Sequence, residues 1–402
     1  MIKKISLFLA CSAIGFATPT LIVDPHFSPY MGAYDLLFTH WALRSTEDYF
    51  RPECNNSSTA TVAGRTMEQL FLWNTINYTA SVTQHEFFGH GYRLRELGVS
   101  PKKYLITPWS GATYFHLKDS FPVGNLLAVV VAGLEAEAIL AQKTKMDWIQ
   151  QRQLDGRLST LYFQAQQSLF FYTLITQKGR VIDNSVSSGN DIEAYLGLMN
   201  ASYDHSTDLG TLLKWSAFNW LDPMTFYALY GWFYYIAEGT PWKFPMIKLK
   251  EGVYYLPNAR IGFAPYGPEA YVENFFSIHE NPLYFYLKGG KRSAGLGISY
   301  DYVLTDRKGS LGVCFDGWRQ NQFVTSSTIG ELDEGLSVAN PALNNKIWGI
   351  AASLTGRWNF HKSFALFAEL GGKTKGYLPG YQLDGGLVAR VGLSLINNKD
   401  EK

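Results

Sequence analysis

The residues best suited to chemistry form one short segment, His85-Glu86-Phe87-Phe88-Gly89-His90-Gly91. Two imidazoles and a carboxylate this close together can bind a metal ion and move a proton. In the common zinc-hydrolase pattern H-E-x-x-H, the histidines are four residues apart and share one helix face. They bind zinc, and the glutamate acts as the general base. Here one additional residue separates the two histidines.

That additional residue changes what the local helix must do. On an ideal α-helix, residues i and i+5 are rotated by about 140° about the axis and cannot both reach one ion. We therefore expect a single π-type bulge between His85 and His90, a distortion that is frequent at functional sites. Gly89 and Gly91 provide backbone freedom at the place where the distortion is needed.

The segment from His85 to Gly91 resembles the H-E-x-x-G-H motif of the dipeptidyl-peptidase III family of zinc peptidases. The resemblance implies that His85 and His90 bind Zn²⁺, that Glu86 activates water, and that a glutamate on a later helix is the third ligand. The rest of the chain does not resemble that family, so its fold and substrate do not carry over. The alternative is a pair of histidines that cap or pair locally on a helix.

A third ligand is needed because catalytic zinc takes three protein ligands and keeps one position for water. An apolar helix expected at 121–145 contains Glu135 and Glu137, and an ionised carboxylate is costly to bury unless it is paired or binds a metal. The two are about 200° apart on a helix, so at most one faces the site. We predict that Glu135 is the third ligand, because its helical neighbours are all apolar. Glu137 remains the other candidate. The alternative is a buried Glu135 paired with Arg93 or Arg95.

Residues 18–248 are predicted to form a mainly helical domain. Asp191 and Glu193 open one of its helices, where the helix dipole favours acidic side chains, so we assign them no catalytic role. No stretch reaches about 20 apolar residues without a charge, so we predict no transmembrane helix. The expected helices cover 67–97, 121–145, 158–176, 192–200, 209–221 and 224–237, with a loop or short strand pair at 104–118.

Residues 249–402 follow a hydrophobic period of two, which is typical of strands. One face is large and apolar and the other small or polar, as in transmembrane β-barrels. We therefore predict an α+β fold: an N-terminal helical zinc-hydrolase-like domain, then a C-terminal antiparallel β-barrel of about eight strands that resembles bacterial outer-membrane barrels. The alternative is a water-soluble β domain. The expected strands cover 254–264, 269–278, 282–288, 294–302, 309–318, 348–358, 363–371 and 387–395.

The N-terminus predicts export. Two lysines precede an apolar run that ends in Gly15-Phe16-Ala17, so residues 1–17 match a signal peptide, and we expect an outer-membrane or periplasmic location. Whether Cys11 is lipidated and whether Cys54 pairs with Cys314 stay open. The formal net charge of +1 provides no field for nucleic acid, so we expect no nucleic-acid partner.

These patterns together predict a zinc-dependent hydrolase of the bacterial cell envelope that contacts outer-membrane lipid. A peptidase is the first choice, with Glu86 as the general base. The alternatives are a non-enzymatic outer-membrane β-barrel protein with a helical cap, and a lipid-directed metallohydrolase. The sequence identifies neither the substrate, peptide or lipid, nor the oligomeric state.

Overall fold

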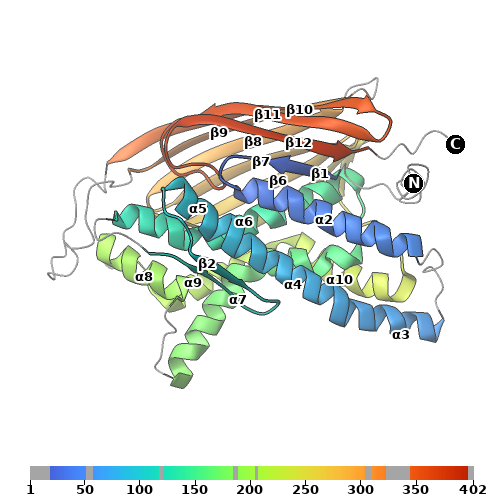
Figure 1. The fold of residues 1–402 in the computed structure, drawn as a ribbon, viewed down its shortest axis with the longest axis horizontal. Helices are drawn as coiled ribbons and strands as arrows, with labels where there is room; N and C mark the ends of the chain where they lie inside the picture. Colours follow the sequence, from blue (N-terminus) through green and yellow to red (C-terminus); the bar gives the residue numbers. More distant parts are fainter. Residues whose placement is uncertain are drawn as a thin grey trace.

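The computed structural model describes residues 19–50, 58–116, 121–183, 189–203, 207–303, 309–322 and 345–396. The predicted signal peptide lies outside the described residues, as do Cys11 and Cys54, and so does any pairing of Cys54 with Cys314. Within the described chain, a layer of helices packs against one face of a large antiparallel sheet (Figure 1).

The sheet contains ten antiparallel strands in the order β1-β12-β11-β10-β9-β8-β7-β6-β5-β4. All eight strands that the alternating pattern predicted are confirmed, as β5 to β12. A separate hairpin of β2 (Lys103–Ile106) and β3 (Gly111–Tyr114) forms a second sheet. The strands of the large sheet are β1 (Thr20–Val23), β4 (Ile247–Lys250), β5 (Val253–Ala264), β6 (Gly267–Ile278), β7 (Asn281–Gly290), β8 (Ser293–Val303), β9 (Gly309–Asn321), β10 (Lys346–His361), β11 (Phe364–Lys373) and β12 (Gly386–Leu395).

The predicted C-terminal β-barrel of about eight strands is wrong. The sheet has two further strands and does not close, since β1 and β4 are its edges and no pairing joins them in the described residues. Both have only four residues, too few for an alternating pattern to be recognised. Helices cover one face of the sheet, so it buries that face without curling onto itself.

The helical layer begins with a helix that the sequence analysis did not predict, α2, and continues with a run that is helical throughout from Thr59 to Glu96. Two π-helical segments, η1 and η2, interrupt this run. The helices are α2 (Pro29–Phe50), α3 (Thr59–Met67), η1 (Glu68–Trp73), α4 (Asn74–Thr83), η2 (Gln84–His90), α5 (Gly91–Glu96), α6 (Val123–Gln151), η3 (Gly156–Leu158), α7 (Ser159–Asp183), α8 (Asp191–Ser202), α9 (Leu209–Ser216), η4 (Ala217–Leu221) and α10 (Pro223–Glu238).

Helices and sheet share their hydrophobic cores. One core joins α6, α7 and α10 to β5, β6 and β7, with Leu140, Leu161 and Phe275 among its buried members. A second joins α6 and α8 to β5, where Tyr195 stacks on Phe263 at 4.4 Å between ring centroids. By length and composition alone α6 could cross a membrane, but 83% of its most apolar window is buried in the protein. α6 is therefore the central helix of the helical layer.

Candidate metal centre

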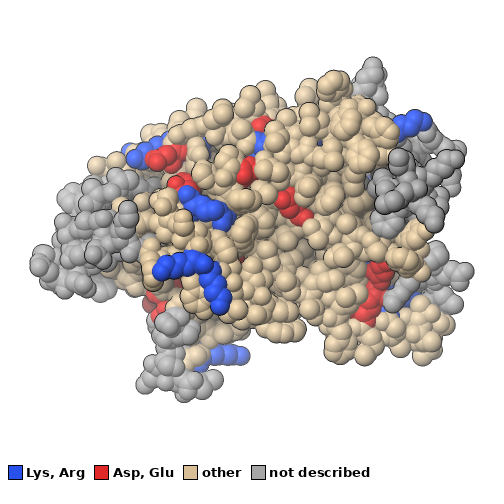
Figure 2. All heavy atoms as spheres, viewed as in Figure 1, with Lys and Arg blue, Asp and Glu red and all other residues tan. Residues whose placement is uncertain are grey.

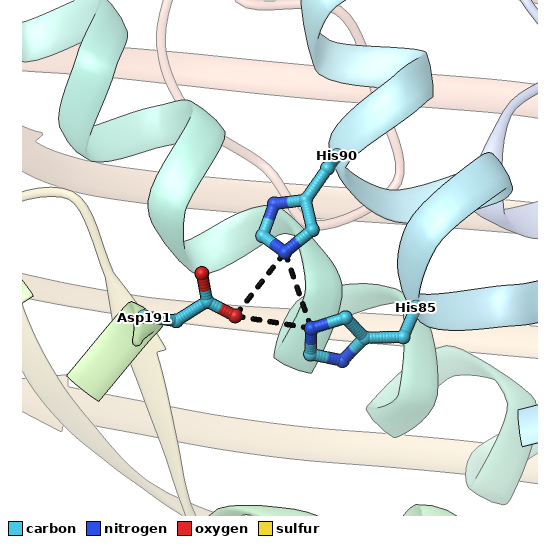
Figure 3. Close-up of side chains that lie close together, drawn as sticks. All are labelled: His85, His90 and Asp191. Carbon is cyan, nitrogen blue, oxygen red and sulfur yellow. Dashed lines mark hydrogen bonds and ion pairs between the residues drawn. The ribbon is translucent and has the colours of Figure 1, made fainter. Parts of the chain in front are cut away.

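His85 and His90 project from η2 toward one point (Figure 3). Their Nε2 atoms lie 3.1 Å apart, and their ring centroids are separated by 4.8 Å. In a π-helix the backbone bonds join residues i and i+5, so side chains five apart share a face. The predicted π-type distortion between the two histidines is confirmed, and it brings both rings to the same place.

Asp191 is the third member of the group. Its Oδ2 atom lies 3.1 Å from Nε2 of His85 and 3.2 Å from Nε2 of His90. It is the first residue of α8, and its backbone N–H donates to the hydroxyl of Tyr172. The side chains of His85, His90 and Asp191 are 12%, 8% and 17% exposed, so the group is enclosed but not sealed from solvent.

The Nδ1 atom of each histidine is held by an acceptor. Nδ1–H of His90 donates to the carbonyl oxygen of Val129 at 2.7 Å, and Nδ1–H of His85 donates to Oε2 of Glu137 at 3.1 Å. The other oxygen of Glu137 accepts from Ser81 at 3.0 Å. Metal-binding histidines typically have their second nitrogen fixed in this way, which leaves Nε2 free to coordinate.

The three free acceptor atoms form a triangle of metal-site size. Its sides are 3.1, 3.1 and 3.2 Å, between Nε2 of His85, Nε2 of His90 and Oδ2 of Asp191. Nitrogen and oxygen ligands held tetrahedrally about 2.0–2.1 Å from zinc lie about 3.3 Å apart. With Nδ1 as the donor on each ring, a cation that replaced the Nε2 protons would have three lone pairs directed at it. These three residues could therefore hold a metal ion.

The electrostatics of the group favour positive charge at its centre. Burial opposes the charge on His85, but Glu137 and Asp191 outweigh it and hold the pKa of His85 well above its usual value. The pKa of His90 is also raised, because Asp191 outweighs the effect of burial. Burial alone would raise the pKa of Asp191, yet His90 and His85 lower it well below its usual value.

Two glycines permit the close approach of η2 to α6. A Cβ on Gly89 would lie 2.7 Å from the carbonyl oxygen of Ala132 and 2.8 Å from Cα of Gly133. A Cβ on Gly133 would lie 2.3 Å from Nε2 of His85. The backbone of Gly89 is not in the left-handed region. Its contribution is the missing side chain, rather than the backbone freedom that the sequence analysis assigned to it.

Glu86 is buried beside the hairpin. The hydroxyl of Thr113 on β3 donates to its Oε2 atom at 2.7 Å. A Cβ on Gly111 would lie 2.5 Å from Cγ of Glu86. The carboxylate is therefore held by a strand that has only one strand neighbour, β2, in the described chain.

Glu135, the predicted third ligand, lies in a different network. Its carboxylate accepts from Arg93 at 3.0 Å, from the hydroxyl of Tyr377 at 2.9 Å, and from the backbone N–H of Gly380. It lines a cavity of about 180 Å³ between α6 and the sheet. The structure thus places Glu135 with Arg93, the alternative raised from the sequence, and brings Asp191 to the histidines. Glu137, the other candidate, contacts Nδ1 of His85, the ring nitrogen that does not face Asp191.

Sequence reasoning missed Asp191 for an identifiable reason. It lies 101 residues from His90 in the chain, so no local spacing connects them. Its one local signal, an acidic residue opening a helix, is fully explained by the helix dipole.

No family model, curated protein or solved structure matches the chain.

Proposed function

We propose that the chain is a metal-dependent hydrolase whose zinc ion is held by His85, His90 and Asp191. The observation that carries the proposal is the triangle of three acceptor atoms with sides of 3.1–3.2 Å, in which both histidines are anchored through Nδ1. Three protein ligands leave a position open, as catalytic zinc requires. The same donor set also suits iron(II), and metal analysis distinguishes the two.

The roles of the chain's own groups follow from this arrangement. Bound zinc would supply Lewis acidity and lower the pKa of a water molecule. Glu86, next to His85 in the chain, would accept the proton of the attacking water and pass it to the leaving group. Thr113 orients the carboxylate of Glu86 by donating to Oε2. Glu137 and the carbonyl of Val129 keep the two imidazoles turned toward the metal.

The hairpin favours a peptide over a lipid as the substrate. β3 has an open edge in the described chain, and it contacts the proposed base through Thr113. An extended peptide backbone binds such an edge by adding a strand, which would bring a peptide bond near Glu86. A lipid-directed hydrolase would use the same water chemistry. The non-enzymatic alternative is a protein that binds a metal at this site without turnover.

The test compares wild-type protein with Glu86→Gln and with Glu238→Gln, a matched change at an exposed residue of α10. Each is assayed against a peptide library by mass spectrometry and against a panel of lipid esters and amides. We expect zinc-dependent cleavage of peptides by wild type and Glu238→Gln, and no turnover by Glu86→Gln with its zinc retained. Equal activity of Glu86→Gln would exclude the mechanism, and zinc binding without any turnover would favour the non-enzymatic alternative.

A further inference from the structure

The outer face of the ten-stranded sheet lacks the polar side chains that a sheet face in water normally carries, although its inner face is buried against the helices. Charged side chains of the strands point to the helical layer and are buried, among them Glu269, Glu273, Lys288, Asp316, Glu369 and Arg390. The other face carries large apolar side chains that are 41–76% exposed, among them Leu296, Leu311, Trp348, Leu354, Leu370 and Leu387. A sheet with one face in water normally turns its polar side chains to that face.

The buried charges are satisfied within the protein. Lys288 lies 3.1 Å from Glu269, and Arg390 lies 2.7 Å from Glu369. These charges are therefore paired on the helix side of the sheet, and none of them is turned to the outer face.

On β10, exposed aromatic side chains flank an aliphatic stretch of the outer face, with Trp348 at one end and Trp358 and Phe360 at the other. Trp348 and Trp358 both point outward, 76% and 67% exposed, and only aliphatic side chains or glycine point outward between them on this strand. At about 3.4 Å per residue, the ten steps between them span about 34 Å along the strand. At the tilt of about 45° usual for strands in membranes, this gives a height of about 24 Å, close to the apolar band of membrane sheets.

Charge returns at one end of this band. Arg319 pairs in register with Trp348, and its guanidinium carbon lies 5.7 Å from the centre of that ring. Tryptophan with a basic neighbour is the combination found where a membrane meets water. The charged side chains visible in Figure 2 are few, and broad areas of the face drawn carry none.

The sheet's edges are protected in two ways. The backbone N–H of Ile22 in β1 donates to Asp35 of α2 at 2.9 Å, so the helix provides an acceptor at that edge. β4 at the other edge is short and carries Lys248 and Lys250, which discourage pairing with another strand. Both edges are thus only four residues long, and the apolar face lies between them.

We propose that the outer face of the sheet, defined by the exposed apolar residues of β6 to β12 and β1, contacts the hydrocarbon of a lipid bilayer. The sheet curves over the helices, so its outer face is convex (Figure 1). Two convex faces of two copies would touch over a small area only, whereas a fluid lipid phase follows the curvature. Lipid therefore covers the whole face better than a second copy would.

The test measures depth in vesicles of phosphatidylcholine and phosphatidylglycerol with brominated acyl chains. The full chain, with its native cysteines replaced, carries one fluorescent label at Leu354→Cys, Trp358→Cys or Lys103→Cys. We expect bromine near the chain ends to quench the label at 354 most, bromine near the headgroups to quench 358 most, and no quenching at 103 on the hairpin. Equal, weak quenching at all three positions would overturn the proposal.

A second pair of variants separates lipid from a second copy. Leu354→Arg should weaken vesicle binding roughly 30-fold or more, the cost of a charge near the centre of a bilayer. Leu354→Phe should bind as wild type does, and circular dichroism checks that both fold. If wild type instead stays off vesicles as a dimer, and Leu354→Arg turns it into a monomer, the face is an interface between copies and the proposal fails.

Discussion

Glu137 accepts a hydrogen bond from Nδ1 of His85 at 3.1 Å, and Ser81 fixes the other oxygen of the same carboxylate. This contact turns Nε2 of His85 toward His90 and Asp191. The two glutamates of α6 thus make different contacts: Glu137 holds His85 of the candidate metal centre, and Glu135 joins α6 to Arg93 and to the segment before β12.

Removing the support of His85 should weaken metal binding without removing a ligand. We expect Glu137→Ala to lower zinc affinity about 10- to 100-fold, the usual cost of losing such a contact. Competition with a fluorescent chelator measures the affinity. Ser81→Ala, which leaves the Glu137–His85 contact in place, should have a smaller effect. Unchanged affinity in Glu137→Ala would show that the contact does not orient the ring.

Substitutions of Asp191 and Glu135 test which of these two carboxylates is the third metal ligand. We expect Asp191→Asn to lose stoichiometric zinc, because the amide oxygen that replaces the carboxylate carries no negative charge. Glu135→Gln should keep zinc and lose about 3 kcal/mol of unfolding free energy, since it breaks a buried ion pair with Arg93. Elemental analysis and chemical denaturation give the two readouts. The reverse pattern would make Glu135 the ligand.

The elements that could be predicted from the sequence are those with a hydrophobic pattern that repeats over many consecutive residues. The strands β5 to β12 have 10 to 16 residues, enough for alternation to be unmistakable. α2 was missed because its buried face contains His40 and Arg44, which destroy the apolar period. Their partners, Asn77 and Asp155, lie 37 and 111 residues away. Such a helix becomes amphipathic only once its partners are in place.

The residues of the candidate site also divide into those that a local spacing predicts and those that it does not. The π-helical segment follows from the five-residue spacing of His85 and His90, since no α-helix could bring both to one ion. That Asp191 rather than Glu135 lies beside the two histidines depends on where the packing of the helices places the start of α8, which no spacing in the chain encodes. Burial of Glu135 was anticipated, but its cost is met by Arg93 and Tyr377 rather than by a metal.

The contact between η2 and α6 leads to a third prediction. Gly133→Ala would place a methyl group 2.3 Å from Nε2 of His85, so the ring must move away from Asp191. We expect loss of stoichiometric zinc with the helical content retained. Gly64→Ala in α3 is the matched control, because nothing lies within 4 Å of its added methyl group. It should keep zinc and stabilise the protein by up to about 1 kcal/mol. Full zinc occupancy in Gly133→Ala would contradict the packing.

Because of Asp155, the free energy of unfolding should fall as the pH becomes acidic. It is 2% exposed and lies 2.8 Å from both Arg44 and Arg157. Burial alone would raise its pKa, but Arg157 and Arg44 hold it well below the usual value. A carboxyl whose folded pKa is lowered stabilises the protein above its unfolded pKa, about 3.9, and loses that contribution as the pH falls below it.

Asp155→Asn should therefore lose about 3 kcal/mol of unfolding free energy at pH 7, because Arg44 and Arg157 both lose a buried carboxylate, although Arg157 keeps Asp48 and Glu47. The difference from wild type should shrink by about 1.4 kcal/mol for each pH unit below 4. Denaturation curves at pH 7, 4 and 3 measure it. Asp147→Asn, which loses only the i,i+4 pair with Lys143, should cost about 0.5 kcal/mol. A difference between Asp155→Asn and wild type that does not change with pH would mean that Asp155 is not held ionised by the two arginines.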